Sequence, residues 1–286
     1  MAKRKSKSNR FLTIIAIVAV IVAIARCVDS CNATKFESRV GPVSIGDNNI
    51  PDSKSLLHVR TAPGLSTNLI HYRGFDVNFN AKEHIPNWVA WELTAEKAQG
   101  TIKRTDNFMA DTHVKGSATP TDYKYSSWDR GHMAPAGDMK WNRQAMDESF
   151  YMTNMVPQFA DLNRGSWNKL EQKCRDWAIA DSAIYIVCGP VPGETPIAHI
   201  GASSVTVPAR LFKVILSPFA TPARGIGFIF NNDENPGGMQ QCAVSIDSVE
   251  SLTGHDFFSA LPDDIENEIE SQCNFNQWSR VKKNKK

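Results

Sequence analysis

The chain has none of the usual zinc-binding patterns of cysteine and histidine. Its six cysteines include no Cys-x-x-Cys pair, and its seven histidines include no His-x-x-x-His or His-Glu-x-x-His arrangement. Because structural zinc sites use ligands at such spacings, we expect none here. Internal repeats and low-complexity stretches are absent as well. What remains is an ordinary globular composition, 42% hydrophobic and 22% charged over 286 residues.

Acidic residues are missing from both ends of the chain. The first ten residues carry five Lys or Arg residues, and residues 280–286, a basic tail, carry another five. The formal net charge is +2, so the part between these ends sums to −8. This excludes a surface that is basic all over. Any binding of a polyanion must therefore use a local basic patch.

Residues 11–25 contain no charged side chain, and Thr13 is their single polar residue. At about 1.5 Å per residue they span roughly 22 Å, less than the ~30 Å hydrocarbon core of a bilayer. We therefore predict a signal peptide over residues 1–25, or an uncleaved signal-anchor that makes the membrane a partner. Either way we expect an extracytoplasmic protein that is secreted, periplasmic or membrane-anchored. The even number of cysteines favours disulfides in such a compartment.

The remaining pattern predicts an irregular segment over residues 26–65 and an α+β domain over residues 66–279. Trp167, Leu170, Cys174 and Trp177 recur at helical spacing, so a helix is expected there. There is no regular alternation of strand and helix, which argues against a parallel sheet. Strands are expected at residues 72–79, 87–93, 183–188, 205–216, 225–230 and 240–246, and helices over most of residues 247–273.

Two segments carry the chemistry. In DRGHMAPAGD, residues 129–138, Arg130 and His132 project from the same side if the backbone is extended, which places a base beside a phosphate-binding group. In DLNRGSWNKLEQKCR, residues 161–175, Glu171 and Arg175 are neighbours on one helix face. Taken singly, each has a simpler interpretation: a structural histidine in a turn, and a surface salt bridge.

Together these segments and YMTNMVPQ, residues 151–158, resemble the DNA/RNA non-specific endonuclease family of ββα-metal nucleases, which includes the endonuclease G enzymes. The resemblance covers residues from about 70 to 275. It implies a ββα-metal nuclease fold with a central, mostly antiparallel sheet flanked by helices. Further matching segments are YIVCGPV at 185–191, VPARLFKVIL at 207–216 and TGHDFFSALPDD at 253–264.

The resemblance also implies roles for individual residues. His132 is the general base, Asn163 is the one direct protein ligand of a divalent cation, and Glu171 orients the water around that cation. Arg130 and Arg175 match positions that steady the phosphate, and Arg104 is assigned a further arginine role. Asn154 supports the site.

A neutral histidine suits this chemistry because it accepts a proton from water near neutral pH. An amide oxygen suits Mg²⁺, which prefers oxygen ligands, and Mn²⁺ is expected to substitute. Arginines contact phosphates and carry no base information. The resemblance therefore implies cleavage of both DNA and RNA with little sequence preference, and activity that EDTA abolishes. We also consider a homodimer.

The resemblance further implies two disulfides, Cys27–Cys31 and Cys242–Cys273. Cys174 and Cys188 form either a third bridge or two buried thiols, and we expect thiols. Two other functions are weighed. One is a non-catalytic polyanion-binding envelope protein of the same fold, which would keep the arginines but lose His132 or Asn163. The other is an envelope scaffold. For an enzyme, DNA uptake or nutrient scavenging is favoured over a toxin.

Overall fold

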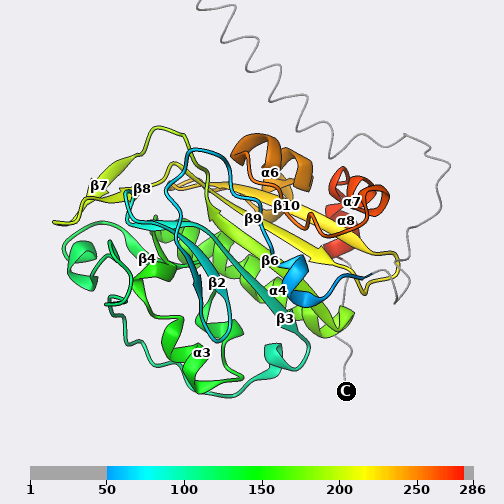
Figure 1. The fold of residues 1–286 in the computed structure, drawn as a ribbon, viewed down its shortest axis with the longest axis horizontal. Coiled ribbons are helices and arrows are strands. Elements are labelled where there is room, and N and C mark those ends of the chain that lie inside the picture. The colour runs from blue at the N-terminus through cyan, green and yellow to red at the C-terminus, as the bar shows by residue number, and fades with distance from the viewer. Residues whose placement is uncertain (1–49, 280–286) are drawn as a thin grey trace, which may run out of the picture. The chain divides into compact units, whose positions relative to one another are not determined.

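The computed structural model describes residues 50–279. Its centre is a seven-stranded sheet in the order β1-β2-β3-β6-β9-β10-β11, with every neighbouring pair antiparallel (Figure 1). The structure thus has the α+β class and the mostly antiparallel sheet predicted from the sequence. The strands are β1 (Leu69–His71), β2 (Asp76–Asn80), β3 (Ile85–Thr94), β6 (Ala183–Pro190), β9 (Arg210–Ser217), β10 (Arg224–Asn231) and β11 (Ala243–Val244).

Two small ribbons and several helices complete this part of the chain. β4 (Asp129–His132) pairs with β5 (Met155–Gln158), and β7 (Ala198–Ile200) pairs with β8 (Val205–Val207). The α-helices are α2 (Ser53–Leu56), α3 (Arg143–Glu148), α4 (Asn168–Asp181), α5 (Met239–Cys242), α6 (Ile246–Thr253), α7 (Asp263–Glu270) and α8 (Phe275–Ser279). Short 3₁₀ helices lie at Lys97–Gln99, Pro120–Tyr123, Ala136–Asp138 and Met152–Asn154.

Both faces of the sheet are buried. Along β6, Ile184 and Ile186 belong to one apolar core, whereas Tyr185 and Val187 belong to the other. Alternate residues of a strand face opposite sides, so a strand covered on both faces is apolar throughout. This explains the continuous apolar run of residues 183–188.

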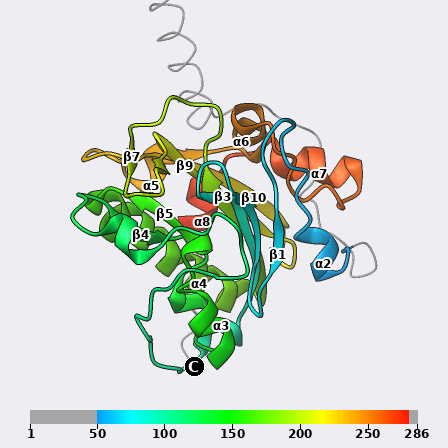
Figure 2. The same cartoon turned by 60° about the vertical axis from the view of Figure 1, so that its left-hand side comes forward.

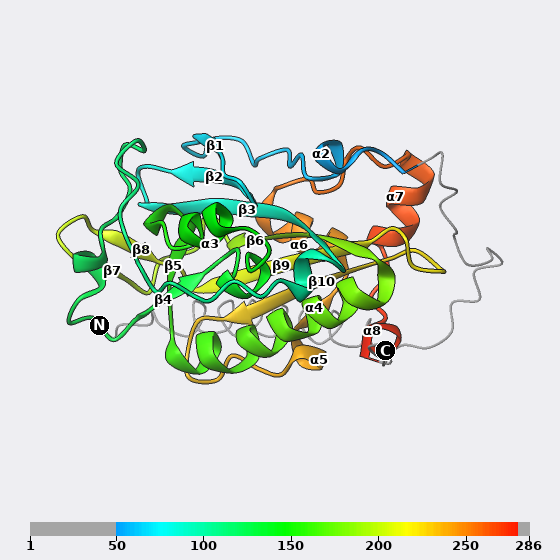
Figure 3. The ribbon, with the colours of Figure 1, turned by 90° about the horizontal axis from the view of Figure 1, so that it is seen from below.

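The two faces are covered by different elements. Helix α4 and the β4–β5 ribbon pack on one face, and α6 and α7 pack on the other (Figure 2). Helix α8 lies beside α4, where Trp177 donates a hydrogen bond from Nε1 to the Trp278 carbonyl at 2.9 Å (Figure 3). The sheet therefore separates a face that carries the motif residues from a face formed by the C-terminal helices.

Three of the expected elements differ from the structure. In the strand expected at residues 72–79, residues 72–75 form the turn between β1 and β2, and the strand begins at Asp76. Residues 205–216 form two strands, because Pro208 and Ala209 separate β8 from β9. The strand expected over residues 240–246 is wrong for most of its length: Met239–Cys242 is helical and only Ala243–Val244 pairs with β10. Short apolar runs do not distinguish a strand from a buried helical turn.

The free cysteines show that one expected disulfide is wrong and confirm the expected pair of buried thiols. Cys242 is a free, buried thiol, so the bridge between Cys242 and Cys273 is not formed. Its Sγ lies 3.2 Å from the Pro236 carbonyl, in the loop before α5. Cys174 and Cys188 are buried free thiols, as expected, and burial raises the pKa of Cys188 to about 12. Both Cys27 and Cys31 lie outside the described residues.

Candidate active site

The β4–β5 ribbon positions the histidine of the first motif. β4 is extended, so Arg130 and His132 project to the same side, as predicted, and both line one cavity of about 580 Å³. Gly131 between them lies against the side chain of Gln158. A Cβ at this position would be 2.2 Å from Gln158 Oε1. The motif therefore needs glycine there to keep the ribbon closed.

The imidazole of His132 lies in an apolar environment. His132 is 8% exposed, and its ring packs edge to face with Phe108 and Phe150 at centroid distances of 5.5 and 5.0 Å. Burial, together with the positive charges of Arg104 and Arg130, lowers the pKa of His132 to about 3. Among the described residues Nε2 has no hydrogen-bond partner. The ring is therefore neutral at physiological pH and able to accept a proton.

Asn154 fixes the backbone that follows this histidine. Its Oδ1 accepts from the Ala134 amide at 2.9 Å, and its Nδ2 donates to the carbonyls of Ala134 and Ser149 at 2.8 and 2.9 Å. Its own carbonyl accepts from the Met133 amide at 3.0 Å. Fully buried, Asn154 lies behind the cavity and holds the motif in shape.

Asn163 lies in the turn that leads into α4. Residues Leu162–Trp167 form a wide, π-helical stretch, a geometry often found at functional sites. Asn163 donates from Nδ2 to Asp129 Oδ2 at 3.0 Å, and Arg164 donates to both Asp129 carboxylate oxygens at 2.7 and 2.6 Å. Burial would raise the pKa of Asp129, but the hydrogen bonds from Arg164 and Asn163 outweigh it and keep the pKa low. Asp129 thereby orients the Asn163 amide.

Asp138 fixes the position of the Arg175 guanidinium group. Its Nη1 donates to Asp138 Oδ1 at 2.8 Å, and Asp138, which is 1% exposed, also accepts from Trp91 Nε1 at 3.1 Å. Gly137 makes room for the guanidinium, because a Cβ there would be 2.8 Å from Arg175 Nη1. The simpler interpretation of the second motif, a surface salt bridge between Glu171 and Arg175, is not what the structure contains.

Glu171 faces the cavity one helical turn before Arg175. It is half-buried, and no hydrogen bond or ion pair to its carboxylate is found within residues 50–279. Burial raises the pKa of Glu171 to about 7, and the charge of Lys213 partly opposes that rise. A carboxylate without a direct protein partner beside Asn163 is available to a cation or to water.

Arg104 and Arg130 lie over the phenylalanines that enclose His132. Arg104 lies 4.9 Å from the Phe150 ring centroid and Arg130 lies 3.9 Å from that of Phe108. Both guanidinium groups are thereby held at the mouth of the cavity. The structure brings all six residues singled out in the sequence to this one cavity: Arg104, Arg130, His132, Asn163, Glu171 and Arg175.

The cavity continues into hollows on either side. One shares Arg104, Arg130, Asn163 and Arg164 with it, and the other shares Gly137, Lys140 and Arg175. We call this continuous depression the basic groove. From the overall charge we expected any polyanion to bind to a local basic patch, and the basic groove is such a patch. Its cationic residues are Lys103, Arg104, Lys124, Arg130, Lys140, Arg164 and Arg175.

A buried cation that was not predicted from the sequence lies beneath the site. Lys213 on β9 is fully buried, and its Nζ lies 4.2 Å from the Trp167 ring and 5.3 Å from the Trp91 ring. No hydrogen-bond partner for Nζ is present in the described part of the chain. The signal was available, because Lys213 is the one charged side chain between Leu211 and Leu216 in an otherwise apolar run.

The sheet, the β4–β5 ribbon and helix α4 together define the class of protein. Two antiparallel strands followed by a helix, with the motif residues on all three elements, form the ββα-metal nuclease arrangement. A solved structure of an EndoG/EndoGI complex is similar to this chain, with a TM-score of 0.64 and 29% sequence identity. The similarity covers 70% of this chain and 89% of that one.

The profile of the DNA/RNA non-specific endonuclease family matches residues 52–264, and the chain belongs to this family. It is similar to the mitochondrial nuclease EXOG of Xenopus laevis, 32% identical over 256 residues that cover 80% of this chain and 67% of that protein. EXOG of Homo sapiens is 30% identical over 291 residues, covering 96% of this chain and 78% of that protein. The chain is thus a nuclease, a phosphodiester hydrolase of a metal-dependent family.

The expected extracytoplasmic location is wrong on these comparisons. Relatives from Homo sapiens and Xenopus laevis are named mitochondrial nucleases. The physical reason is that an apolar run behind basic residues indicates targeting but does not specify which membrane or compartment receives it. Secretion, a periplasmic location and membrane anchoring therefore do not follow from residues 11–25, which lie outside the described residues. Within residues 50–279 no helix is long and apolar enough to cross a bilayer.

Proposed function

We propose that this nuclease cleaves DNA and RNA internally, with His132 as the general base and a divalent cation held at Asn163. One observation carries the proposal: a buried, neutral imidazole opens into the same cavity as Asn163, Glu171 and four arginines. A base that stays unprotonated, next to cations that bind phosphate, is what hydrolysis of a phosphodiester requires.

The donor set of the cavity fits magnesium. Nδ2 of Asn163 is engaged by Asp129, so the amide oxygen is the atom left for a cation, and the Glu171 carboxylate adds oxygen atoms nearby. Oxygen donors suit Mg²⁺ or Mn²⁺, and the absence of cysteine and of a second histidine from the lining of this cavity disfavours zinc. When bound, such an ion neutralises negative charge on the leaving oxygen. Asn163 would hold it and Glu171 would orient its water molecules.

The protein side chains supply the remaining steps. His132 takes the proton of the attacking water, and its lowered pKa ensures that the ring is free to do so. Arg104, Arg130 and Arg175 bind the phosphate and stabilise the charge that develops on it. Because these side chains recognise phosphate alone, we expect cleavage with little sequence preference and of both DNA and RNA.

Replacing His132 with Ala tests the base. We expect turnover on supercoiled plasmid to fall roughly 10² to 10⁴-fold, while binding of a DNA duplex in EDTA changes little, because the arginines remain. His113→Ala is the matched control, since His113 is exposed and does not line the cavity. Wild-type turnover by His132→Ala, or a loss that extra magnesium alone restores, would rule out this role.

Replacing Asn163 with Ala tests the metal site. We expect a comparable loss of turnover, but one that is partly recovered at high magnesium because the ion binds more weakly while the base is intact. The magnesium concentration at half-maximal rate should rise strongly for Asn163→Ala and stay unchanged for His132→Ala. Equal magnesium midpoints in the two variants would remove Asn163 from the metal site.

A further inference from the structure

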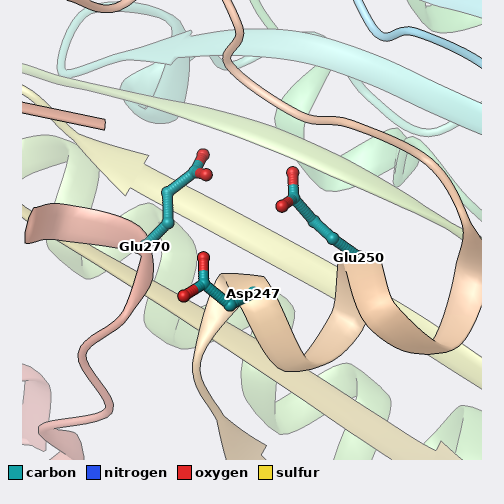
Figure 4. Close-up of side chains that lie close together, drawn as sticks. All are labelled: Asp247, Glu250 and Glu270. Atoms are coloured by element: carbon teal, nitrogen blue, oxygen red, sulfur yellow. The ribbon is translucent and has the colours of Figure 1, made fainter. Parts of the chain in front are cut away.

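A second cluster of acidic side chains lies on the face of the sheet away from the basic groove. Asp247 and Glu250 come from α6, and Glu270 comes from the last turn of α7. Figure 4 shows the three side chains converging between the helices and the sheet. One carboxylate oxygen from each lies within 4.8 Å of the other two. None of the three residues lines the cavity described above.

Glu270 is the unusual member of the cluster. It is 3% exposed, and its Oε1 is fully buried with no hydrogen-bond partner among the described residues. An ionised carboxylate in such a position is costly unless a cation compensates it. The buried Oε1 of Glu270 is therefore open to coordination by a cation between the helices.

The surrounding side chains do not supply that compensation. In the part of the chain that the structure describes, no Lys or Arg forms an ion pair with Asp247, Glu250 or Glu270. Arg60, whose positive charge acts on the neighbouring Glu266, is paired with Asp256 at 2.9 Å. Glu250 is held in place by the Phe257 amide, which donates to its Oε1 at 2.8 Å.

The charges of the cluster act on one another. Burial, reinforced by neighbouring carboxylates, raises the pKa of Glu250 to about 7 and that of Glu270 to about 10. Burial raises the pKa of Asp247 as well. A cation bound between these carboxylates would relieve the repulsion between them.

We propose that Asp247, Glu250 and Glu270 form a binding site for one calcium ion. Two oxygens bound to the same Ca²⁺ at 2.3–2.6 Å are at most about 5 Å apart, so three carboxylate oxygens that all lie within 4.8 Å of one another can bind one ion after small side-chain adjustments. Mg²⁺ is usually held by one or two carboxylates and keeps several water molecules, so a site with three carboxylates suits Ca²⁺ better. Backbone and water oxygens would complete the coordination. Calcium bound here joins the start of α6 to the end of α7 and stabilises the fold without taking part in hydrolysis.

The experiment measures thermal unfolding of the full chain, stripped with EDTA and then given 1 mM CaCl₂. We expect calcium to raise the melting temperature by roughly 3 to 6 °C in the wild type. Asn163→Ala should keep the whole shift, because that substitution removes the proposed catalytic metal ligand and leaves the cluster intact. Asp264→Asn, an exposed carboxylate on the same α7, is the matched control and should keep it too.

Two variants must lose the shift. Glu270→Gln removes the buried charge, and Asp247→Asn removes an exposed carboxylate whose loss leaves the core unchanged. Each is compared with itself in EDTA and in calcium, so a change in intrinsic stability cancels. A calcium shift of wild-type size in both variants, or no shift in the wild type, would overturn the proposal. The second result would mean that Glu270 is a protonated acid with no cation.

Discussion

At the scale of single residues, Lys213 connects the two halves of the active site. The two tryptophans that enclose its ammonium group each donate a hydrogen bond to the site: Trp167 to the His132 carbonyl at 3.3 Å, and Trp91 to Asp138. A desolvated cation over an aromatic face contributes about 2 kcal/mol or more. Lys213 therefore positions groups that we propose bind substrate, although it does not itself line the cavity.

Replacing Lys213 with Met tests this role. Met fills similar space without charge, so the Glu171 carboxylate loses the positive charge that opposes the rise in its pKa. We expect kcat/KM at pH 7 to fall about 10-fold or more, and the acidic limb of its pH profile to move to higher pH. Lys169→Met, on the exposed face of α4, should leave the profile unchanged. A uniform loss at every pH would show that Lys213 acts by packing alone.

The residues that line the cavity could be predicted from the sequence, whereas most of their partners could not. His132 and Asn163 stand in two recognisable motifs, and their chemistry follows from their residue types. That Asp129 orients Asn163 across 34 positions, or that Asp138 holds Arg175 across 37, depends on how the ribbon packs on α4. The sequence does not indicate which of many polar side chains an acidic residue will contact in the folded protein.

At the scale of secondary structure, prediction succeeded where the apolar pattern was continuous or clearly periodic. The apolar run of residues 183–188 and the helical spacing from Trp167 to Trp177 correspond to β6 and α4. It failed at residues 240–246, where Gln240, Gln241 and Ser245 interrupt the apolar residues and leave no clear period of two. The π-helical stretch over Leu162–Trp167 has no sequence signature at all, yet it places Asn163.

The loop after α6 predicts a pH dependence of stability. Nδ1 of the buried His255 accepts a hydrogen bond from the Ala62 amide at 2.9 Å, which requires a neutral ring. Burial lowers the pKa of His255 to about 4 from 6.5. As the pH falls, the unfolded chain binds the proton at His255 before the folded chain does. The stabilisation that the neutral ring gives the folded chain is therefore complete above pH 6.5 and is lost as the pH falls toward 4.

Chemical denaturation of the wild type and of His255→Gln measures this contribution. Gln keeps an acceptor for the Ala62 amide but does not titrate. Between pH 7 and pH 4 we expect the wild type to lose up to about 3 kcal/mol of unfolding free energy relative to the variant. The carboxylates of α6 and α7, whose raised pKa values stabilise the folded chain as the pH falls, contribute equally in both proteins. Their effect therefore cancels when the two unfolding free energies are subtracted. Parallel curves over this range would show that His255 is charged in the folded protein.

At the scale of the whole described domain, the basic groove predicts salt-sensitive binding. Lys124 lines the hollow at one end of the groove, and Lys140 lines the hollow at the other end together with the adjoining edge of the central cavity. Each phosphate contact that a cation makes contributes about 0.9 to the slope of log K against log salt concentration for duplex DNA. The double variant Lys124→Gln and Lys140→Gln should therefore reduce the slope by about 2.

Binding is measured with His132→Ala as the background, so that the duplex is not cut during the titration. Lys82→Gln, which lies outside the groove, is the control and should keep the full slope. An unchanged slope in the double variant would mean that the duplex does not follow the groove to its ends.

The order of strands in the sheet has a consequence for folding kinetics. β3 and β6 are neighbours, but residues 95–182, which carry all six cavity residues, separate them along the chain. Pairing these strands closes a long loop, which lowers the conformational entropy of the chain. This entropic cost comes before α4 has a completed sheet to pack on. Folding should therefore be slow for a domain of this size, and the active site should appear in the same late step that joins the two halves of the sheet. Nuclease activity regained during refolding would then report the pairing of β3 with β6.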